Sequence, residues 1–358
     1  MHIFLCIWFS EGKGEFLMYI LFRKHAARGG IAAFLAVLVI GGICIQSAFA
    51  DSGQEKQFIR YVEFNPTFSA MERALELDIR SHEEEIPVNW VDLLAIGAAA
   101  CGGNFSGFSL SYLDKTAQRL QQGETIEEIT RNMPYYAYYR EAYGAVLDGL
   151  VGEYEVYLPD ESGQGGSWKR SYGLKAFSPI AEGWYYEGYD DFGQSRTYGY
   201  ARRHLGHDML GSVGTPVVAV ESGRVEAVGW NQYGGWRIGI RSLDGKRYYY
   251  YAHLRKDHPY TPLAQEGCYV TAGDVIGYLG QTGYSLTENT NNIEIPHLHF
   301  GLELIFDESQ KESDNEIWVD VYALTRLLSR HRCTVVRDED TGEYKRAYAF
   351  REVQTSED

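Results

Sequence analysis

The chain has 358 residues, of which 45% are hydrophobic and 23% are charged, a composition typical of globular proteins and not of disordered ones. Its formal net charge at neutral pH is -16. An acidic chain without a basic stripe is a poor candidate for binding nucleic acid, or for holding another anionic polymer by charge alone.

The first 50 residues have the pattern of an export signal. A cationic stretch precedes an uncharged apolar run over 31–45, and Ser47-Ala48-Phe49-Ala50 has the small-x-small spacing of a signal-peptidase site. We therefore predict a signal peptide over 1–50, cleaved after Ala50. The apolar run is shorter than the roughly 20 residues of a membrane span, but extended over 31–50 it would just reach. An uncleaved N-terminal membrane anchor is therefore the alternative.

Residues 51–152 are predicted to form a helical domain. Phe68, Met71, Leu75 and Ile79 recur at spacings of three and four, the stripe of an amphipathic helix. Further helices are predicted over 90–101, from a capping box at Thr125 to Glu128, and over 135–150. This region carries no recognisable catalytic constellation.

The following segment, 153–175, contains a run of glycine, serine and acidic residues and is predicted to be a linker. Over 176–306 the hydrophobic period changes to that of short strands, and Asp244-Gly245 predicts a hairpin turn. A C-terminal helix at about 319–332 and a charged tail complete the last segment, 307–358. The predicted fold class is therefore α+β, with the helical domain first and a β domain after it.

Two of the ten histidines are separated by a single leucine, in His297-Leu298-His299-Phe300. Side chains two apart on a strand point to the same face, so both imidazoles would enter one space. Leu298 and Phe300 would face the opposite way, into a core. Two unrelated surface histidines on a strand are the alternative interpretation.

Two more motifs precede this pair. His204 and Asp208 are four apart in a glycine-containing stretch, so both can face one side of an extended segment, whereas His207 has the wrong parity to join them. A hydrogen bond that only ties down a loop is the alternative for this pair. His253 closes a tyrosine-rich strand. Such a set is what a mononuclear zinc hydrolase requires, because three protein ligands leave a coordination position for water. The chain has no His-Glu-x-x-His segment, which excludes a thermolysin-type arrangement.

These motifs, H-x-x-x-D, a lone histidine after a tyrosine-containing strand, and H-x-H, occur in the order of the LytM/lysostaphin-type family of zinc metallopeptidases. The sequence resembles that family over about Gly199 to Glu303, including the glycine-rich stretch from Gly267 to Gly283. Members of the family cleave peptide bonds in bacterial peptidoglycan. The resemblance implies a groove on a small antiparallel β-sheet, with one Zn²⁺ per chain.

Carried over by position, the resemblance implies that His204, Asp208 and His299 bind zinc and that His253 and His297 form a catalytic pair outside the ligand set. It also implies a mechanism in which zinc lowers the pKa of its bound water toward neutrality, so that hydroxide attacks the scissile carbonyl. One histidine would then help to stabilise the oxyanion, and the other would move a proton to the leaving amine.

Two departures from the family pattern stand out. The residues from Tyr284 to Ile295 are inserted before the H-x-H motif, and we predict that they form a wall or lid of the groove. His207 stands where the family has an apolar residue, and we expect it behind the ligands or on the surface. Tyr200 and Tyr284 are candidates for lining the substrate groove, although ordinary strand tyrosines are an equally good interpretation.

The sequence thus predicts a secreted, zinc-dependent endopeptidase of the cell envelope that hydrolyses peptide bonds of bacterial peptidoglycan. The alternative is a non-enzymatic LytM-like binding module in an envelope or division assembly, although such relatives typically lack ligand residues. We expect membrane contact only through an uncleaved anchor. The helical domain is a candidate for docking a protein partner.

Overall fold

The computed structural model describes residues 3–11, 14–22, 59–160, 165–198, 200–311 and 313–353. The chain divides into two compact units, Met1–Phe58 and Ile59–Asp358. In the first unit the strands β1 (Ile3–Glu11) and β2 (Gly14–Phe22) pair antiparallel. The apolar run and the cleavage pattern predicted for export lie outside the described residues. Within the described ranges, no helix has both the length and the apolar character needed to cross a bilayer.

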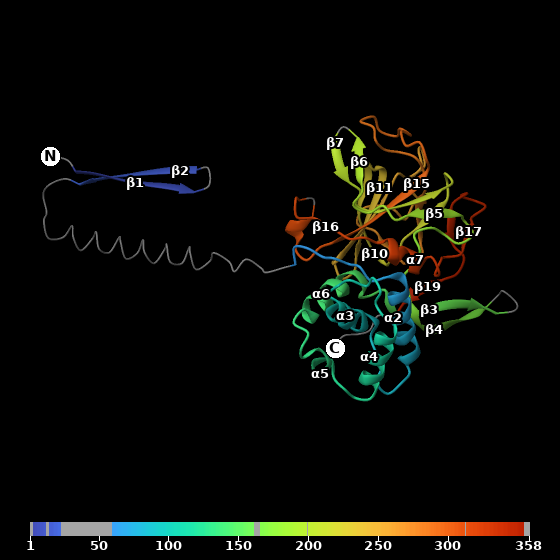
Figure 1. The fold of residues 1–358 in the computed structure, drawn as a ribbon. Coiled ribbons are helices and arrows are strands. Elements are labelled where there is room, and N and C mark those ends of the chain that lie inside the picture. Colours follow the sequence, from blue (N-terminus) through green and yellow to red (C-terminus); the bar gives the residue numbers. More distant parts are fainter. Residues whose placement is uncertain are drawn as a thin grey trace. The chain divides into compact units, whose positions relative to one another are not determined.

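Helices form the first part of the second unit (Figure 1). They are α2 (Phe68–Ser81), α3 (Trp90–Cys101), α4 (Ser111–Gln121), α5 (Ile126–Thr130) and α6 (Tyr136–Leu147). Four of them lie where the sequence predicts helices. The fifth, α4, was not predicted, because its N-cap residue Leu110 makes no side-chain capping bond and leaves no start signal in the sequence.

Local signals explain where several helices begin and end. Asn89 caps α3 by accepting hydrogen bonds from two backbone N–H groups, and the helix ends at Gly102 with a φ of 65°. A glycine favours that left-handed conformation, which a side chain would strain. The capping box predicted between Thr125 and Glu128 is present at the start of α5. These caps satisfy backbone groups that a helix terminus otherwise leaves unpaired.

The main sheet has eight strands in the order β13-β10-β11-β12-β15-β8-β5, with β16 paired to β15, and its neighbouring strands are antiparallel. The strands are β5 (Tyr186–Tyr189), β8 (His207–Gly211), β10 (Gly223–Asn231), β11 (Gly235–Ser242), β12 (Arg247–Ala252), β13 (Tyr269–Val270), β15 (His297–Leu304) and β16 (Ile317–Trp318). The α+β fold class predicted from the sequence is confirmed.

Smaller sheets surround this one. β9 (Pro216–Val218) pairs with β14 (Val275–Tyr278), β6 (Ser195–Tyr198) with β7 (Tyr200–Arg203), and β17 (Val335–Arg337) with β18 (Tyr344–Arg346). A three-stranded sheet joins β3 (Val151–Pro159), β4 (Gly166–Leu174) and β19 (Phe350–Glu352).

Strand β15 shows how the sheet separates core from cleft. Leu298 and Phe300 are buried on one face, and His297 and His299 alternate with them on the other. The buried face belongs to a hydrophobic core that also contains residues of α2, α3 and α6. Helices and sheet therefore stabilise each other through one continuous apolar interior.

A buried ion pair also connects the sheet to the helices. The Arg247 guanidinium, of which 1% is exposed, donates to Glu221 over 2.8 and 3.0 Å and to Asp244 over 3.0 Å. It also donates to the backbone carbonyl of Ala145 in α6, at 3.0 Å. The positive charge is thus paired on the sheet side and hydrogen-bonded on the helix side, as a buried arginine requires.

Three segments differ from their predicted form. The predicted linker 153–175 is largely the paired strands β3 and β4, which are antiparallel from Val151 opposite Leu174 to Pro159 opposite Gly166. The predicted charged tail is also structured: β19 pairs with β3, and Phe350 is buried. The C-terminal helix α7 (Tyr322–Leu328) is shorter than predicted, because Val319 instead donates its N–H to Leu302 of the sheet.

Candidate metal centre

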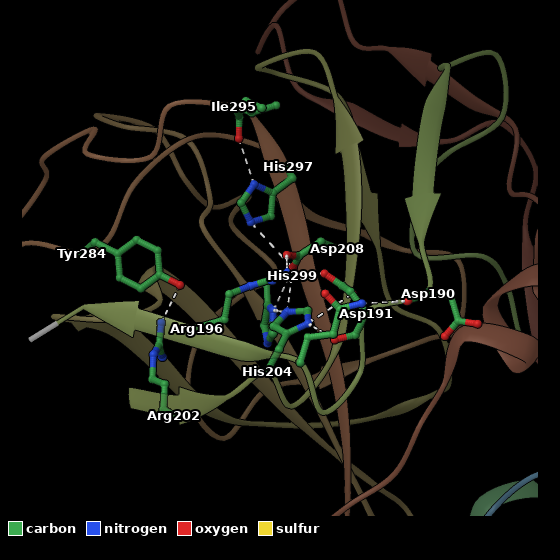
Figure 2. A network of polar contacts seen from close by, with 11 residues as sticks. Asp190, Asp191, Arg196, Arg202, His204, Asp208, Tyr284, Ile295, His297 and His299 are labelled. Atoms are coloured by element: carbon green, nitrogen blue, oxygen red, sulfur yellow. Dashed lines mark hydrogen bonds and ion pairs between the residues drawn. The ribbon is translucent and has the colours of Figure 1, made fainter. Parts of the chain in front are cut away.

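Three of the predicted ligands lie together at one end of the open sheet face (Figure 2). Asp208 of β8 and His299 of β15 are directly paired across the sheet, and His204 lies in the connection that leads into β8. His204 Nε2 is 2.9 Å from Asp208 Oδ1 and 2.9 Å from His299 Nδ1, and the last two atoms are 3.0 Å apart. Atoms bound to one small cation would have to converge in this way.

A neighbouring aspartate and an arginine hold this cluster. Nδ1 of His204 is 3.3 Å from the backbone carbonyl of Asp191 and 3.1 Å from its carboxylate, so Nε2 is the nitrogen turned toward the cluster. Arg196 pairs with Asp191 and lies 3.4 Å from Oδ2 of Asp208. Neither residue was predicted from the sequence, because neither belongs to a motif and both reach the site only through the fold.

The cluster has the protonation states that metal binding needs. Burial alone would raise the pKa of Asp208, but hydrogen bonds from His204 and His299 outweigh it and hold that pKa far below the usual value. Burial lowers the pKa of His299. The carboxylate is therefore ionised and the imidazole neutral, which are the forms that coordinate a cation.

Gly206 allows the close approach of His299. A Cβ atom at this position would lie 2.6 Å from Cε1 and 2.7 Å from Nε2 of the His299 ring, and 2.8 Å from the backbone oxygen of Phe300. Any larger residue would displace the imidazole or the strand. The glycine is therefore part of the geometry of the cluster.

Two nitrogens that face each other beside a carboxylate oxygen are poorly arranged for hydrogen bonding alone, since one proton at most can lie between the imidazoles. The same arrangement suits a divalent metal ion, because two imidazoles and a carboxylate are a common ligand set with open coordination positions. The residues His204, Asp208 and His299 therefore fit a metal centre.

The other two predicted histidines lie beside the cluster. His253 places Nδ1 2.9 Å from the backbone carbonyl of Thr282, and His297 places Nδ1 2.8 Å from that of Ile295. Their ring centroids are 4.8 Å apart, and Nε2 of His297 is 3.7 Å from Oδ1 of Asp208. Both rings thus donate Nδ1–H to the backbone and keep Nε2 available as a proton acceptor.

His253 has an unusual backbone, with a φ of 62°. A non-glycine residue in this region costs of order 1–3 kcal/mol and persists only where the surroundings enforce it. Here the N–H of His253 donates to Gly234 and that of Leu254 to Trp236, which fixes the turn at the end of β12. Burial lowers the pKa of His253 well below its usual value.

The remaining predicted residues have separate outcomes. His207 is buried on the core face, with Nδ1 2.7 Å from Oγ1 of Thr325 in α7, so a surface position is wrong. Burial lowers its pKa to about 4.

Tyr284 lines the cleft, and its hydroxyl accepts a hydrogen bond from Arg202. For Tyr200 only the backbone, in β7, lies within the described residues.

A cleft of about 470 Å³ opens over this face of the sheet. Beside His204, Asp208, His253 and His299 it is lined by aromatic and basic side chains from the sheet, from the β6–β7 hairpin and from the insertion that begins at Tyr284. A peptide in this cleft would contact both aromatic rings and arginines.

Residues 202–313 match the sequence pattern of peptidase family M23. This segment contains the cluster and both neighbouring histidines. It is a peptidase family M23 domain. The resemblance to LytM/lysostaphin-type proteins predicted from the motifs is thereby confirmed.

Individual relatives agree with this assignment of the M23 domain. The chain is 39% identical to the L-Ala--D-Glu endopeptidase of Bacillus subtilis over 111 residues, which are 31% of this chain and 32% of that protein. It is 41% identical to lysostaphin of Staphylococcus staphylolyticus over 98 residues, 27% of this chain and 18% of that protein. The match therefore spans about a third or less of the length of these relatives.

A solved structure extends the likeness in fold beyond the M23 domain. The crystal structure of a lytM protein from Ruminococcus gnavus superposes with a TM-score of 0.51 at 24% identity. It covers 78% of this chain and 94% of that chain. A match of this extent includes more than residues 202–313, so the likeness in fold reaches beyond the M23 domain.

Proposed function

We propose that this protein is a zinc-dependent endopeptidase that hydrolyses peptide bonds of bacterial peptidoglycan. The observation that supports this most strongly is the convergence of three side-chain atoms, one each from His204, Asp208 and His299, which lie 2.9 to 3.0 Å from one another. His253 and His297 lie beside them. When bound there, Zn²⁺ supplies Lewis-acid chemistry, activating water and polarising the carbonyl under attack.

The two neighbouring histidines would move protons and stabilise charge. Each is held by a backbone carbonyl at Nδ1, so Nε2 is the atom that can accept a proton from water or donate one to the leaving amine. The lowered pKa of His253 keeps it neutral at pH 7, as a base requires. In protonated form the same atom would stabilise a developing oxyanion.

The choice of peptidoglycan rests on the relatives. One is named for the bond between L-Ala and D-Glu, and another, 40% identical over 98 residues, is a glycyl-glycine endopeptidase. Both names describe peptide bonds, and we carry only this common class over to the present chain.

We further propose that the protein is exported and that cleavage after Ala50 leaves Asp51 as the mature N-terminus. The basis is the sequence pattern over 31–50. N-terminal sequencing of protein from the native envelope tests this, and a terminus before residue 31 would show an uncleaved anchor instead. Docking of a protein partner at the helical domain stays a prediction.

The decisive experiment combines metal analysis with hydrolysis. The purified protein should contain about one zinc per chain, lose its activity on purified sacculi when a chelator removes the metal, and regain it with added Zn²⁺. Mass analysis of the released fragments would identify the bond. A protein that stays metal-free in added zinc and binds sacculi without cutting them would instead be a binding module.

A further inference from the structure

Three arginines that line the cleft have no carboxylate partner among the described residues. Arg202, Arg203 and Arg237 form no ion pair with a described side chain, whereas the other basic side chains of the cleft are each paired with a carboxylate. The chain as a whole has a net charge of -16. Unneutralised positive charge gathered in one cleft of an acidic protein indicates an anionic ligand.

Arg237 has a buried N–H group without an acceptor among the described residues. Its Nε is buried and has no hydrogen-bond partner in the described part of the chain. A buried guanidinium N–H without an acceptor costs free energy, which a bound acceptor would recover. Nε of Arg202 is buried and unpartnered in the same way.

Arg202 is held in place by aromatic rings. Its guanidinium lies over the rings of Tyr233 and Tyr284, 5.0 and 4.9 Å from their centroids, and donates to the hydroxyl of Tyr284. Figure 2 shows this pair beside the metal cluster. Tyrosine is neutral at pH 7, so these contacts position the positive charge without cancelling it.

Arg202 and Arg237 line the cleft that contains the metal ligands, and Tyr250 lies in the same cleft. The Tyr250 ring is 6.0 Å from that of His299, measured between centroids. Both arginines therefore share a cleft with the metal ligand and with the tyrosine ring beside it.

Apart from the ligand Asp208, the acidic side chains of the cleft, Glu303 and Glu316, lie farther along the sheet. Glu303 follows His299 by four residues on β15, which is about 13 Å of strand. Glu316 accepts a hydrogen bond from Trp318, which pairs with Glu303. The cleft thus has a basic part next to the metal ligands and an acidic part at its far end.

We propose that Arg237 and Arg202 form a carboxylate-binding subsite, so that the cleft takes a peptide with a free carboxylate close to the cleaved bond and not a neutral glycine bridge. This inference rests on the proposed function, because it names the class of peptide that the same cleft accepts. An arginine fork binds a carboxylate through two parallel hydrogen bonds, which selects strongly for the charged group.

The sheet register sets how far the carboxylate is from the cleaved bond. Arg237 precedes Ile238, which pairs with Tyr251, and the next residue of β12, Ala252, pairs with His299. Arg237 is therefore two strands from His299, about 10 Å between backbones. One extended residue spans about 3.5 Å, so the carboxylate belongs to a residue within about three positions of the bond.

The test compares peptides that differ by one functional group. Stem-peptide fragments carrying either a free carboxylate or a carboxamide at the acidic residue are assayed with the zinc-loaded protein, together with an oligoglycine peptide. The free acid should have a kcat/KM about tenfold to a hundredfold higher than the carboxamide, as expected for a charge-assisted contact. Arg237→Gln should remove this preference through a higher KM, with zinc content unchanged.

Arg241→Gln is the matched control, because it lies on the same strand and face but its guanidinium already pairs with Glu226 and Glu308. It should keep the preference. Equal kcat/KM for acid and amide in the natural protein, or an unaltered preference in Arg237→Gln, would overturn the subsite.

A second measurement separates this inference from the proposed function. Calorimetric binding of the same peptides to protein stripped of zinc requires no hydrolysis, and the acid should again bind more tightly than the amide. If nothing is hydrolysed but this difference persists and disappears in Arg237→Gln, the subsite holds and the peptidase proposal fails. If bonds are cut but acid and amide bind equally, the subsite fails and the peptidase proposal holds.

Discussion

Nδ1 of His253 lies 2.9 Å from the backbone carbonyl oxygen of Thr282, which leaves Nε2 as the nitrogen directed toward the neighbouring histidines. This single hydrogen bond fixes both the tautomer and the orientation of the ring. His253 is separate from the ligands because, among the described residues, the side chains whose atoms converge are His204, Asp208 and His299.

That separation predicts two different phenotypes. His204→Ala or His299→Ala removes a ligand, so zinc and activity should be lost together. His253→Ala or His297→Ala should keep close to one zinc per chain but lower hydrolysis by about a hundredfold to ten-thousandfold, the scale of a positioned proton-transfer or oxyanion group. Elemental analysis beside peptidoglycan hydrolysis measures both. His207→Ala, altered on the core face, should retain its zinc.

The assignment has clear ways to fail. Loss of metal from His253→Ala would make that residue a ligand. Wild-type rates in His297→Ala would remove it from the reaction, even with the zinc site established.

The insertion that begins at Tyr284 is anchored through the side chain of Asn289. Removal of that side chain should loosen this wall of the cleft. Asn289 accepts from Nε1 of Trp236 at 2.8 Å and from the N–H of Asp257 at 2.9 Å, and its φ of 58° suits asparagine. Asn289→Ala should raise KM about threefold to tenfold with zinc content unchanged. Leu286→Ser, at an 86% exposed position, should behave like the natural protein. Identical KM values for all three proteins would show that the insertion does not shape the cleft.

The buried charge of Arg247 should matter for stability and not for chemistry. Arg247→Met leaves Glu221 without its partner inside the protein, and removal of one member of a buried pair costs about 3–5 kcal/mol. Tm should fall by on the order of 10 °C. Urea unfolding followed by circular dichroism measures the change. Arg224→Met, whose side chain makes one long bond to a surface carbonyl, is the control. Equal unfolding midpoints for the two variants would contradict a stabilising role.

The C-terminal segment should protect a thiol. Cys333 is fully buried, and burial raises its pKa to about 11, whereas Cys268 is exposed. Because the thiolate is the reactive form, alkylation under native conditions should modify Cys268 quickly and Cys333 only after unfolding. Truncation after Asp340 removes β18 and β19 and should make Cys333 reactive. Mass mapping of labelled peptides gives both rates, and rapid labelling of Cys333 in the intact protein would mean that the segment is detached.

Sequence reasoning succeeded where periodicity decides the structure. The spacing of His297 and His299 placed both on one face, because a strand alternates with period two whatever its neighbours are. It did not find Asp191 or Arg196, which reach Asp208 and His204 only after β5 and the β6–β7 hairpin fold against the sheet. Such contacts depend on register between distant segments, which no local pattern encodes.

The misread linker has a related cause. A run of glycine and serine has the same composition whether it joins two domains or two strands. What distinguishes the β3–β4 hairpin is its third strand, β19, which comes from the other end of the chain. A pairing partner almost 200 positions away carries no signal in the hairpin itself.

The absence of a side chain at Gly206 constrains the sequence of this site as strongly as the metal ligands do. Since a methyl group there would collide with the His299 ring, glycine is the residue type that this position tolerates. In saturation mutagenesis, substitutions of Gly206 should therefore be poorly tolerated, although this residue contributes no donor atom to the metal. The Gly206 variants should contain little metal even though all three ligands are intact. Redesign of the cleft for a new substrate would therefore have to keep glycine at this position.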